Sequence, residues 1–311
     1  MTAAPEIVPD TQYRGVLTVL PPILRDLALL ARFDRPIGWW LLFWPCAWGL
    51  FLAGGTGRWG MIFWLLLGSI AMRGAGCVYN DIVDADLDAR VARTAARPIA
   101  SGAISKKTAW AWLFALCGVG LVVLLQLRWE AQLVALGSLG LVAAYPFMKR
   151  ITGWPQAWLG LVFTWGAPVG WIEVTGFAPS SPYGLAPLGA LYAGCWAWCM
   201  AYDTIYALQD REDDAMVGIG SSALSFGQYV RAGVTGLYAM AIACWAGAVW
   251  LVRPDPVALL ALLPVALHFA WQALTLDTAN GDSALARFRS NRFAGALMAS
   301  ACFVVGAATQ L

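Results

Sequence analysis

Residues 59–88 read WGMIFWLLLGSIAMRGAGCVYNDIVDADLD, an apolar run that ends in a dense group of acids. The first part, residues 59–78, is long enough to cross the hydrocarbon core of a bilayer, which takes about 20 apolar residues in a helix. The end of the stretch holds Asp81, Asp84, Asp86 and Asp88. Burying an unpaired charge is costly, so acids gathered at a membrane edge require cations. The stretch therefore predicts a membrane-spanning helix followed by a cation-binding site.

The polar residues of this stretch are spaced like the turns of an α-helix. Residues four apart in a helix differ by about 40° in direction and about 6 Å in height. Asn80, Asp84 and Asp88 therefore form one stripe, whereas Asp81 and Asp86 point elsewhere. An amide and two carboxylates are hard oxygen ligands, which suit Mg²⁺ better than a soft metal. We expect a magnesium site at this stripe.

A second acidic cluster lies farther along the chain. Asp203, Asp210 and Asp214 are seven and four residues apart, which places them on one helical face, with Tyr206 near it. One such cluster alone would favour a simple solvated loop end. Two clusters, each with a striped face and each following a hydrophobic segment, favour a functional role instead.

The composition is that of a polytopic membrane protein. Of the 311 residues, 60% are hydrophobic and only 12% are charged, which is far from an ordinary soluble domain. We expect an all-α protein in which residues 1–36 form an N-terminal segment with an amphipathic surface helix and residues 37–311 form one transmembrane domain. The lipid bilayer is then a partner, and neither nucleic acid nor an obligate protein partner is expected. The nine predicted spans are 37–53, 59–78, 108–127, 131–147, 157–174, 183–202, 228–251, 257–276 and 293–310.

The basic residues predict how these spans are oriented. Most of the twenty Lys and Arg residues lie in the N-terminal segment and in the loops that follow the even-numbered spans, whereas Arg58, Arg128 and Arg253 lie in the opposite loops. The positive-inside rule then places the N-terminus and both acidic clusters on the cytoplasmic side. We expect an integral protein of the bacterial inner membrane with a site that faces the cytoplasm.

The acidic clusters are accompanied by the cations that an anionic substrate requires. Arg97 follows the first acidic stripe, and Lys149 and Arg150 follow the fourth span. Arg73 lies within the second span, and an arginine inside a membrane span is a functional candidate by default. The alternative is that the loop cations are topology signals only. Acids, Mg²⁺ and clustered basic residues together describe a diphosphate site.

Several motifs carry a resemblance that covers the chain from about Arg32 to its end. They are Asn80-Asp81-x-x-Asp84-x-x-x-Asp88, YDTIYALQDREDD at 202–214, RFDRPIG at 32–38, Arg73-x-x-Gly76-Cys77, RPIASG at 97–102, YPFMKR at 145–150 and SNR at 290–292. In this combination the chain resembles the UbiA-type intramembrane aromatic prenyltransferases. The first and second motifs look like the two aspartate motifs of that family.

The resemblance implies nine helices around a central cavity, capped by short cytoplasmic helices. It also implies transfer of a polyprenyl group from polyprenyl diphosphate to the ring carbon ortho to the hydroxyl of 4-hydroxybenzoate, in ubiquinone biosynthesis. The cofactor implied is Mg²⁺, with Asn80, Asp84, Asp88, Asp210 and Asp214 as its ligands. The substrate site is expected to use Arg73, Arg97 and Lys149 for the diphosphate, Arg150 for the benzoate carboxylate, Tyr145, Tyr202 and Tyr206 to shelter the allylic cation, and Asp203 as a further substrate contact.

Two alternatives remain at this point. The chain is the same kind of enzyme with another acceptor, such as homogentisate, a naphthoate, a chlorophyllide, haem or a glycerol phosphate. Alternatively, it is a non-catalytic ion-coupled transporter. Transporter sites lie near the midplane on broken helices of repeated halves, whereas the acids here gather at one face and no repeat is visible.

Overall fold

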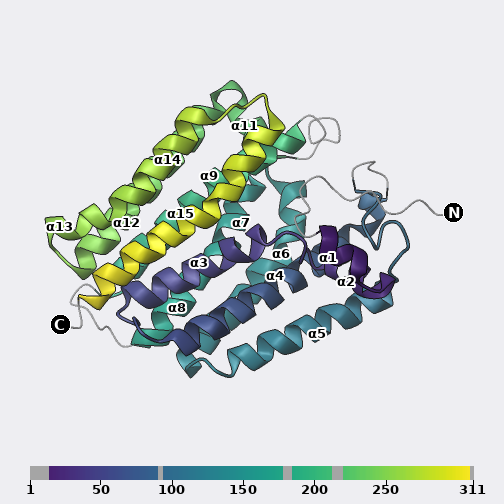
Figure 1. Cartoon of the computed structure of the whole chain (residues 1–311), viewed down its shortest axis with the longest axis horizontal. Coiled ribbons are helices and arrows are strands. Elements are labelled where there is room, and N and C mark those ends of the chain that lie inside the picture. Colours follow the sequence, from purple (N-terminus) through teal and green to yellow (C-terminus); the bar gives the residue numbers. More distant parts are fainter. Residues whose placement is uncertain (1–13, 90–93, 178–183, 212–219, 309–311) are drawn as a thin grey trace. The chain divides into compact units, whose positions relative to one another are not determined.

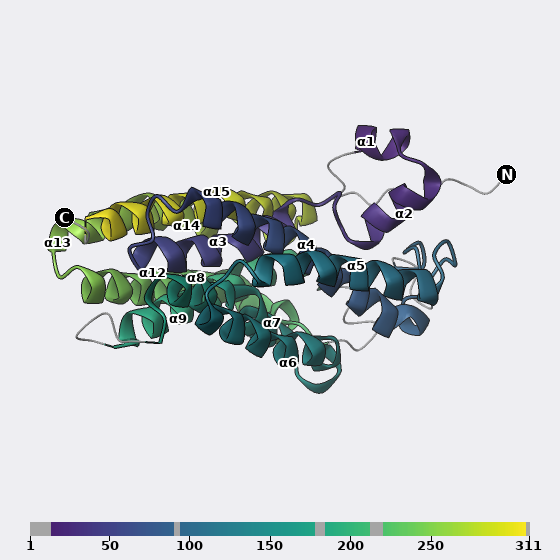
Figure 2. The same ribbon diagram turned by 90° about the horizontal axis from the view of Figure 1, so that it is seen from below.

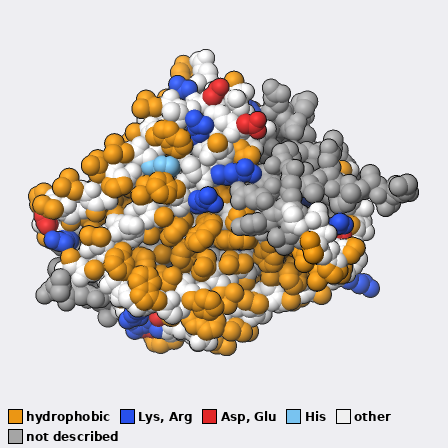
Figure 3. All heavy atoms as spheres, in the orientation of Figure 1, with side chains coloured by type: hydrophobic (Ala, Val, Ile, Leu, Met, Phe, Trp, Pro, Cys, Tyr) orange, Lys and Arg blue, Asp and Glu red, His pale blue; other side chains and the backbone are white. Residues whose placement is uncertain are grey.

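The structure, a computed structural model, describes residues 14–89, 94–177, 184–211 and 220–308. These residues form α-helices and short 3-10 turns without any strand, which confirms the all-α class. Hydrophobic side chains cover much of the face seen in Figure 3. Within the described ranges, five helical segments are long and apolar enough to cross a membrane: Trp59–Asp86, Lys106–Leu124, Trp129–Met148, Ser222–Val252 and Pro256–Thr275. The nine spans and the cap helices thus stay predictions.

The chain divides into two compact units, Met1–Trp40 with Trp64–Gln126, and Leu41–Phe63 with Leu127–Leu311. The first unit contains α1 (Arg14–Val19), α2 (Pro22–Leu30), the start of α3 (Ile37–Leu52), most of α4 (Trp59–Asp88) and α5 (Lys106–Leu124). The second unit contains the rest of α3 and the helices from α6 onward. The division into an N-terminal segment and one domain stays a prediction.

In the first unit, α4 and α5 lie side by side and α2 closes over them (Figures 1 and 2). The buried core joins Leu30 of α2, Val78 and Ile82 of α4, and Leu113 and Leu116 of α5. The indole Nε1 of Trp112 donates a hydrogen bond to the carbonyl of Leu27 at 3.2 Å. These contacts fix α2 next to the end of α4, where the first acidic stretch lies.

Helix α4 continues without a break from the apolar run into the acids, ending at Asp88. The helical spacing inferred for Asn80, Asp84 and Asp88 is therefore confirmed. The chain then returns through a loop whose Ile99 and Ile104 are buried in the same core. Helix α5 begins after Ser105, whose hydroxyl accepts from the backbone N–H of Thr108 at 3.1 Å, as expected for a helix N-cap.

The second unit is a bundle in which α9 packs on α12, and α14 and α15 run side by side (Figures 1 and 2). Its centre holds three tryptophans, Trp48, Trp198 and Trp245, all fully buried. The elements are α6 (Trp129–Ile151), α7 (Pro155–Thr164), α8 (Gly166–Thr175), α9 (Ala186–Ala207), η1 (Leu208–Asp210), α11 (Ser222–Phe226), η2 (Gly227–Tyr229), α12 (Val230–Val252), α13 (Pro256–Leu259), η3 (Leu260–Leu262), α14 (Leu263–Thr275) and α15 (Gly281–Ala307).

Glycines allow helices of this unit to approach one another closely. A methyl group at Gly194 of α9 would overlap the ring of Trp245, and one at Gly170 of α8 would overlap the backbone of Cys46 in α3. Small residues at such crossings let helix backbones come together where larger side chains would hold them apart.

Two predicted spans are not single regular α-helices. The span expected at 157–174 is two helices, α7 and α8, which meet at Trp165. The span expected at 257–276 matches the membrane-length segment Pro256–Thr275, which runs through α13, the 3-10 turn η3 and α14. Gly166, just after the break between α7 and α8, packs closely against Cys46. The break therefore accompanies a tertiary contact, which a hydropathy pattern cannot predict.

Candidate functional site

Three of the four acids at the end of α4 are buried rather than solvated. Asp84 has no exposed surface, Asp81 is 2% exposed and Asp88 is 6% exposed. Buried carboxylates need cations or hydrogen bonds in compensation. The interpretation as a solvated acidic loop end therefore does not hold for this stretch.

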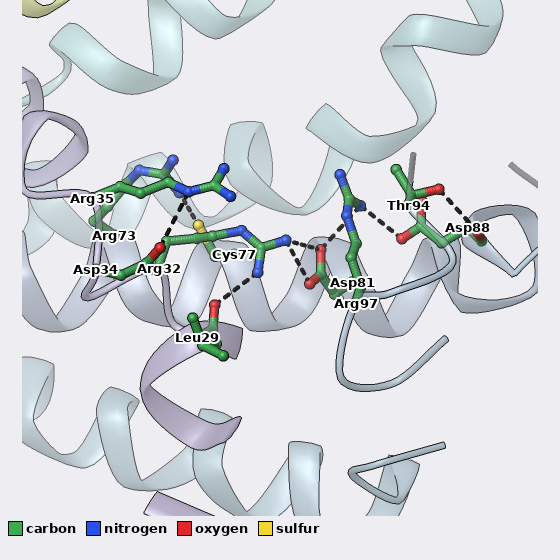
Figure 4. Close-up of polar contacts among 10 residues, drawn as sticks. All are labelled: Leu29, Arg32, Asp34, Arg35, Arg73, Cys77, Asp81, Asp88, Thr94 and Arg97. Carbon is green, nitrogen blue, oxygen red and sulfur yellow. Dashed lines mark hydrogen bonds and ion pairs between the residues drawn. The ribbon is translucent and has the colours of Figure 1, made fainter. Parts of the chain in front are cut away.

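Two arginines supply compensating charge (Figure 4). The Nη2 atom of Arg32 donates to both carboxylate oxygens of Asp81, at 2.8 and 3.1 Å. The Nη1 atom of Arg97 donates to Asp81 at 3.2 Å and to Asp88 at 2.7 Å. Asp81 thus lies between two guanidinium groups, and Arg97 bridges Asp81 to Asp88. We call Arg32, Asp81, Arg97 and Asp88 the arginine–aspartate chain.

Arg32 is held in place by the end of α2. Its φ of 57° lies in the left-handed region, which costs a non-glycine residue about 1 kcal/mol or more. The N–H of Phe33 donates to the carbonyl of Ala28 at 2.9 Å, and the N–H of Arg32 to that of Leu29 at 3.1 Å. This is the Schellman helix end, at which glycine usually takes the position of Arg32. An arginine is present at a place where the backbone favours glycine.

Arg97 is positioned by the loop that follows α4. Its backbone N–H donates to the carbonyl of Thr94 at 2.9 Å, and its carbonyl accepts from Ser101 at 2.9 Å. The hydroxyl of Thr94 donates to the carbonyl of Asp88 at 2.9 Å, which ties the loop to the last turn of α4. The guanidinium is therefore fixed from its own backbone as well as by the two carboxylates.

The charges change the proton affinities of this chain of residues. Burial by itself would lower the pKa of Arg32, but Asp81, Cys77 and Asp34 together outweigh it and the pKa is raised. Burial raises the pKa of Asp88, against the opposing effect of Arg97. Arg97 is thus what favours the ionised form of Asp88 in this surrounding.

Arg73 lies on the same helix as the acids, one turn before Cys77, whose sulfur it contacts. A methyl group at Gly38 would come within 2.7 Å of Nε of Arg73, so the glycine makes room for the arginine. Nearby, Nε of Arg35 is 3.4 Å from the buried carboxylate of Asp34. These residues belong to the RFDRPIG stretch and to the span that carries Arg73, which places the two motifs together.

The second motif lies on α9 and η1 in the other unit. Tyr202 is 1% exposed, and its ring centroid lies 4.8 Å from that of Trp198 and 6.0 Å from that of Phe288. The centroid of Tyr206 lies 4.6 Å from that of Phe288. Asp203 is half-buried on the same helix. Asp214 and the side chain of Asp210 lie outside the described residues.

The remaining predicted residues are on α6. Tyr145 is half-buried there, and Lys149 and Arg150 belong to its last turns, with side chains outside what the structure describes. Sequence reasoning missed the roles of Asp81, set aside because it points away from the stripe, and of Arg32, noted only as part of a motif. The sequence feature that could have indicated these roles is the basic segment before the first span, which can pair with the acids that follow the second span.

The donor set of α4 fits a hard cation. Asn80, Asp84 and Asp88 present oxygen atoms on successive turns, and oxygen is the donor that Mg²⁺ prefers. Among the described residues, no group of three or more His, Cys, Asp or Glu is placed to hold a metal ion. Asp210 and Asp214 are the predicted ligands that fall outside that set.

The family is decided by comparison with known proteins. Residues 42–300 match the model of the UbiA prenyltransferase family. The chain belongs to this family. Its UbiA relatives include 4-hydroxybenzoate polyprenyltransferase, mitochondrial, of Drosophila melanogaster, 39% identical over 300 residues, or 96% of this chain and 74% of the relative. The protein of the same name from Caenorhabditis elegans is 40% identical over 289 residues, or 90% of this chain and 78% of the relative.

Solved UbiA structures share the fold. The apo structure of a UbiA homolog from Aeropyrum pernix K1 has a TM-score of 0.70 and 24% identity, covering 85% of this chain and 97% of the other. A UbiA homolog from Archaeoglobus fulgidus bound to GPP and Mg²⁺ has a TM-score of 0.67 and 17% identity, covering 90% and 99%.

The comparisons correct the predicted location. Curated relatives from Drosophila melanogaster, Drosophila pseudoobscura pseudoobscura and Arabidopsis thaliana are named as mitochondrial proteins, so the expectation of a bacterial inner membrane with a cytoplasmic site is contradicted. Charge counts in the loops compare the two sides of a membrane, and they carry no information on which membrane it is.

Proposed function

We propose that this chain is a 4-hydroxybenzoate polyprenyltransferase. It transfers a polyprenyl group from polyprenyl diphosphate to the ring carbon ortho to the hydroxyl of 4-hydroxybenzoate. The products are 3-polyprenyl-4-hydroxybenzoate and diphosphate, on the route to ubiquinone. The observation that carries this proposal is the identity of about 40% with enzymes of that name over nine-tenths or more of the chain.

The donor is bound through its diphosphate. Asn80, Asp84 and Asp88, together with Asp210 and Asp214, hold Mg²⁺, as supported by their oxygen donors and by the Mg²⁺ bound with GPP in the Archaeoglobus fulgidus homolog. Bound Mg²⁺ supplies positive charge that stabilises the diphosphate as it leaves. Arg73, Arg97 and Lys149 add hydrogen bonds to the phosphate oxygens, where charge-assisted bonds are strongest.

The reaction exchanges one bond for another. The allylic C–O bond of the donor breaks, and diphosphate leaves with the electron pair. The ortho carbon of the phenol forms the new C–C bond and then loses its proton. Tyr145, Tyr202 and Tyr206 shelter the developing allylic cation, because aromatic faces attract cations. Tyr202 and Tyr206 both pack on Phe288, so these two candidates belong to one aromatic cluster.

The acceptor is oriented by its carboxylate. Arg150 can hold a carboxylate by two parallel hydrogen bonds, which also sets the direction of the ring. Asp203 lies on the same helix as Tyr202 and Tyr206 and completes the substrate contacts from that side of the motif.

A panel of acceptors with a single polyprenyl diphosphate donor tests this proposal. Membranes that contain the chain are expected to prenylate 4-hydroxybenzoate in the presence of Mg²⁺ and to lose that activity with a chelator. Turnover of homogentisate or a naphthoate in preference to 4-hydroxybenzoate would reassign the acceptor. Membership of the UbiA family removes the basis for the transporter interpretation.

A further inference from the structure

Arg97 occupies an unusual place for a residue expected to contact substrate. Its Nη1 atom is 2.7 Å from Oδ2 of Asp88, and Asp88 is one of the carboxylates assigned to the metal. The same atom is 3.2 Å from Oδ1 of Asp81. A single cationic group is therefore shared between a predicted metal ligand and a neighbouring acid that lies off the stripe.

The two acids differ in how firmly they are engaged. Asp81 is 2% exposed and also accepts two hydrogen bonds from Arg32, whose backbone is fixed by the Schellman helix end. Arg97 is more accessible, with 27% of its side chain exposed. The Arg32–Asp81 pair is thus the fixed part of the arginine–aspartate chain, and the Arg97–Asp88 pair is the part that can be exchanged.

We propose that Arg97 and a divalent cation compete for Asp88, and that Asp81 is the positioning residue that retains Arg97 when the cation takes its place. This inference rests on the proposed function for the role of the metal. The guanidinium neutralises Asp88 until a dication binds. It then stays anchored on Asp81, beside the site, where it is available to the diphosphate. The site thus gains the charge of the dication, while Asp81 and Asp88 each keep a cationic partner at every stage.

The left-handed backbone at Arg32 fits this arrangement. A glycine at that position would relieve the backbone but would leave Asp81 with Arg97 alone. Arg97 would then be needed as the partner of two buried acids and could not be released from either without cost. Because Arg32 also pairs with Asp81, Arg97 can leave Asp88 without Asp81 losing its cationic partner.

The test is a titration of Mn²⁺ into the purified full-length protein in detergent, without prenyl diphosphate, following the free ion by electron paramagnetic resonance. R97Q removes the competing cation and keeps a polar side chain. It is expected to bind Mn²⁺ about tenfold more tightly than the wild type, the effect of losing one charge-assisted hydrogen bond. The lysine side chain of R97K is shorter and pairs less well with Asp88. Its Mn²⁺ affinity is therefore expected to lie between that of the wild type and that of R97Q.

A matched control comes from the same region of the first unit. Lys106 pairs with Asp86 at 3.2 Å, and both side chains are exposed, so K106Q removes one positive charge near the acids without touching the arginine–aspartate chain. Its Mn²⁺ affinity is expected to stay within about twofold of the wild type, since exposed charges are well screened by solvent.

A second readout separates competition from a purely structural role. In steady-state assays the KM of R97Q for the prenyl donor is expected to rise about tenfold while its Mn²⁺ dissociation constant falls. A structural defect would weaken the binding of both the prenyl donor and Mn²⁺. Unchanged or weaker Mn²⁺ binding in R97Q, or an equal gain in K106Q, overturns the inference. If instead the wild type transfers no prenyl group to any acceptor, the proposed function fails, and the Mn²⁺ titration still decides the competition between Arg97 and a dication.

Discussion

At the scale of single residues, neighbouring aspartates of one helix have different tasks. Asp84 is fully buried, Asp81 pairs with two arginines, and the carboxylate of Asp86 is 86% exposed beside Lys106. Helical direction separates Asp86 from Asp84, since residues two apart in a helix point to nearly opposite sides, about 160° apart. The consequence is that substitutions only two positions apart should have very different effects.

Asp84→Ala is expected to lower kcat by at least about a hundredfold, because losing a metal ligand removes several kcal/mol of transition-state stabilisation. Asp86→Ala is the matched control on the same turn, and it should stay within about twofold of the wild type because exposed ion pairs contribute little. The measurement is kcat at saturating Mg²⁺ for protein that elutes as a single species. Near wild-type turnover of Asp84→Ala would remove this residue from the metal site.

Arg150→Ala is expected to raise KM for 4-hydroxybenzoate about tenfold to a hundredfold, which corresponds to one charge-assisted pair, while KM for the prenyl donor changes little. Varying each substrate in turn separates the two constants. If Arg150 only anchors its loop to anionic lipid, both constants stay the same. A rise confined to the prenyl donor would assign Arg150 to the diphosphate.

At the scale of the helices, the second unit is held together by close crossings and by a buried polar network. The indole of Trp198 in α9 donates to Oδ1 of Asn291 in α15 at 2.9 Å. The amide of Asn291 donates to Gln272 in α14 at 3.2 Å, and the hydroxyl of Tyr238 in α12 donates to the same oxygen at 2.7 Å. Four helices are thereby joined through one set of hydrogen bonds, next to the aromatic residues of the second motif.

Asn291→Ala is expected to lower the free energy of unfolding by about 1–3 kcal/mol, because Trp198 Nε1 and the carbonyls of Arg287 and Phe288 lose a buried partner. Ser300→Ala serves as the control, since that exposed serine on the same helix bonds only to the carbonyl of Ala296. Thermal unfolding followed by circular dichroism in detergent compares them. Equal melting temperatures for both variants would show that the network contributes nothing to stability.

Gly194→Ala is expected to destabilise the crossing of α9 and α12 by about 1–3 kcal/mol, because the added methyl overlaps the Trp245 ring and the carbonyl of Ala241. Gly189→Ala on the same helix has open space around the new methyl and should be neutral or stabilising, since alanine is the better helix former. The two melting temperatures should therefore move apart, and a common shift would contradict the packing shown here.

At the scale of the whole molecule, sequence reasoning succeeded where a pattern is local. The acids of α4 continue the helix of the apolar run, as their spacing predicted, and the all-α class follows from composition. It failed where tertiary contacts decide. The break at Trp165 accompanies the close packing of Gly166 and Gly170 on α3, and the side chain of Arg32 pairs with Asp81, 49 positions away in the chain. Neither contact leaves a periodic signal.

The central claim is that this chain joins a polyprenyl group to the ortho carbon of 4-hydroxybenzoate at a site that requires Asp84. The most direct measurement gives ring-labelled 4-hydroxybenzoate, polyprenyl diphosphate and Mg²⁺ to membranes with either the wild type or Asp84→Ala, and identifies the product by mass spectrometry and nuclear magnetic resonance. The expected result is 3-polyprenyl-4-hydroxybenzoate from the wild type and almost none from the variant. An oxygen-linked product, no product at all, or equal formation by both proteins would contradict the account.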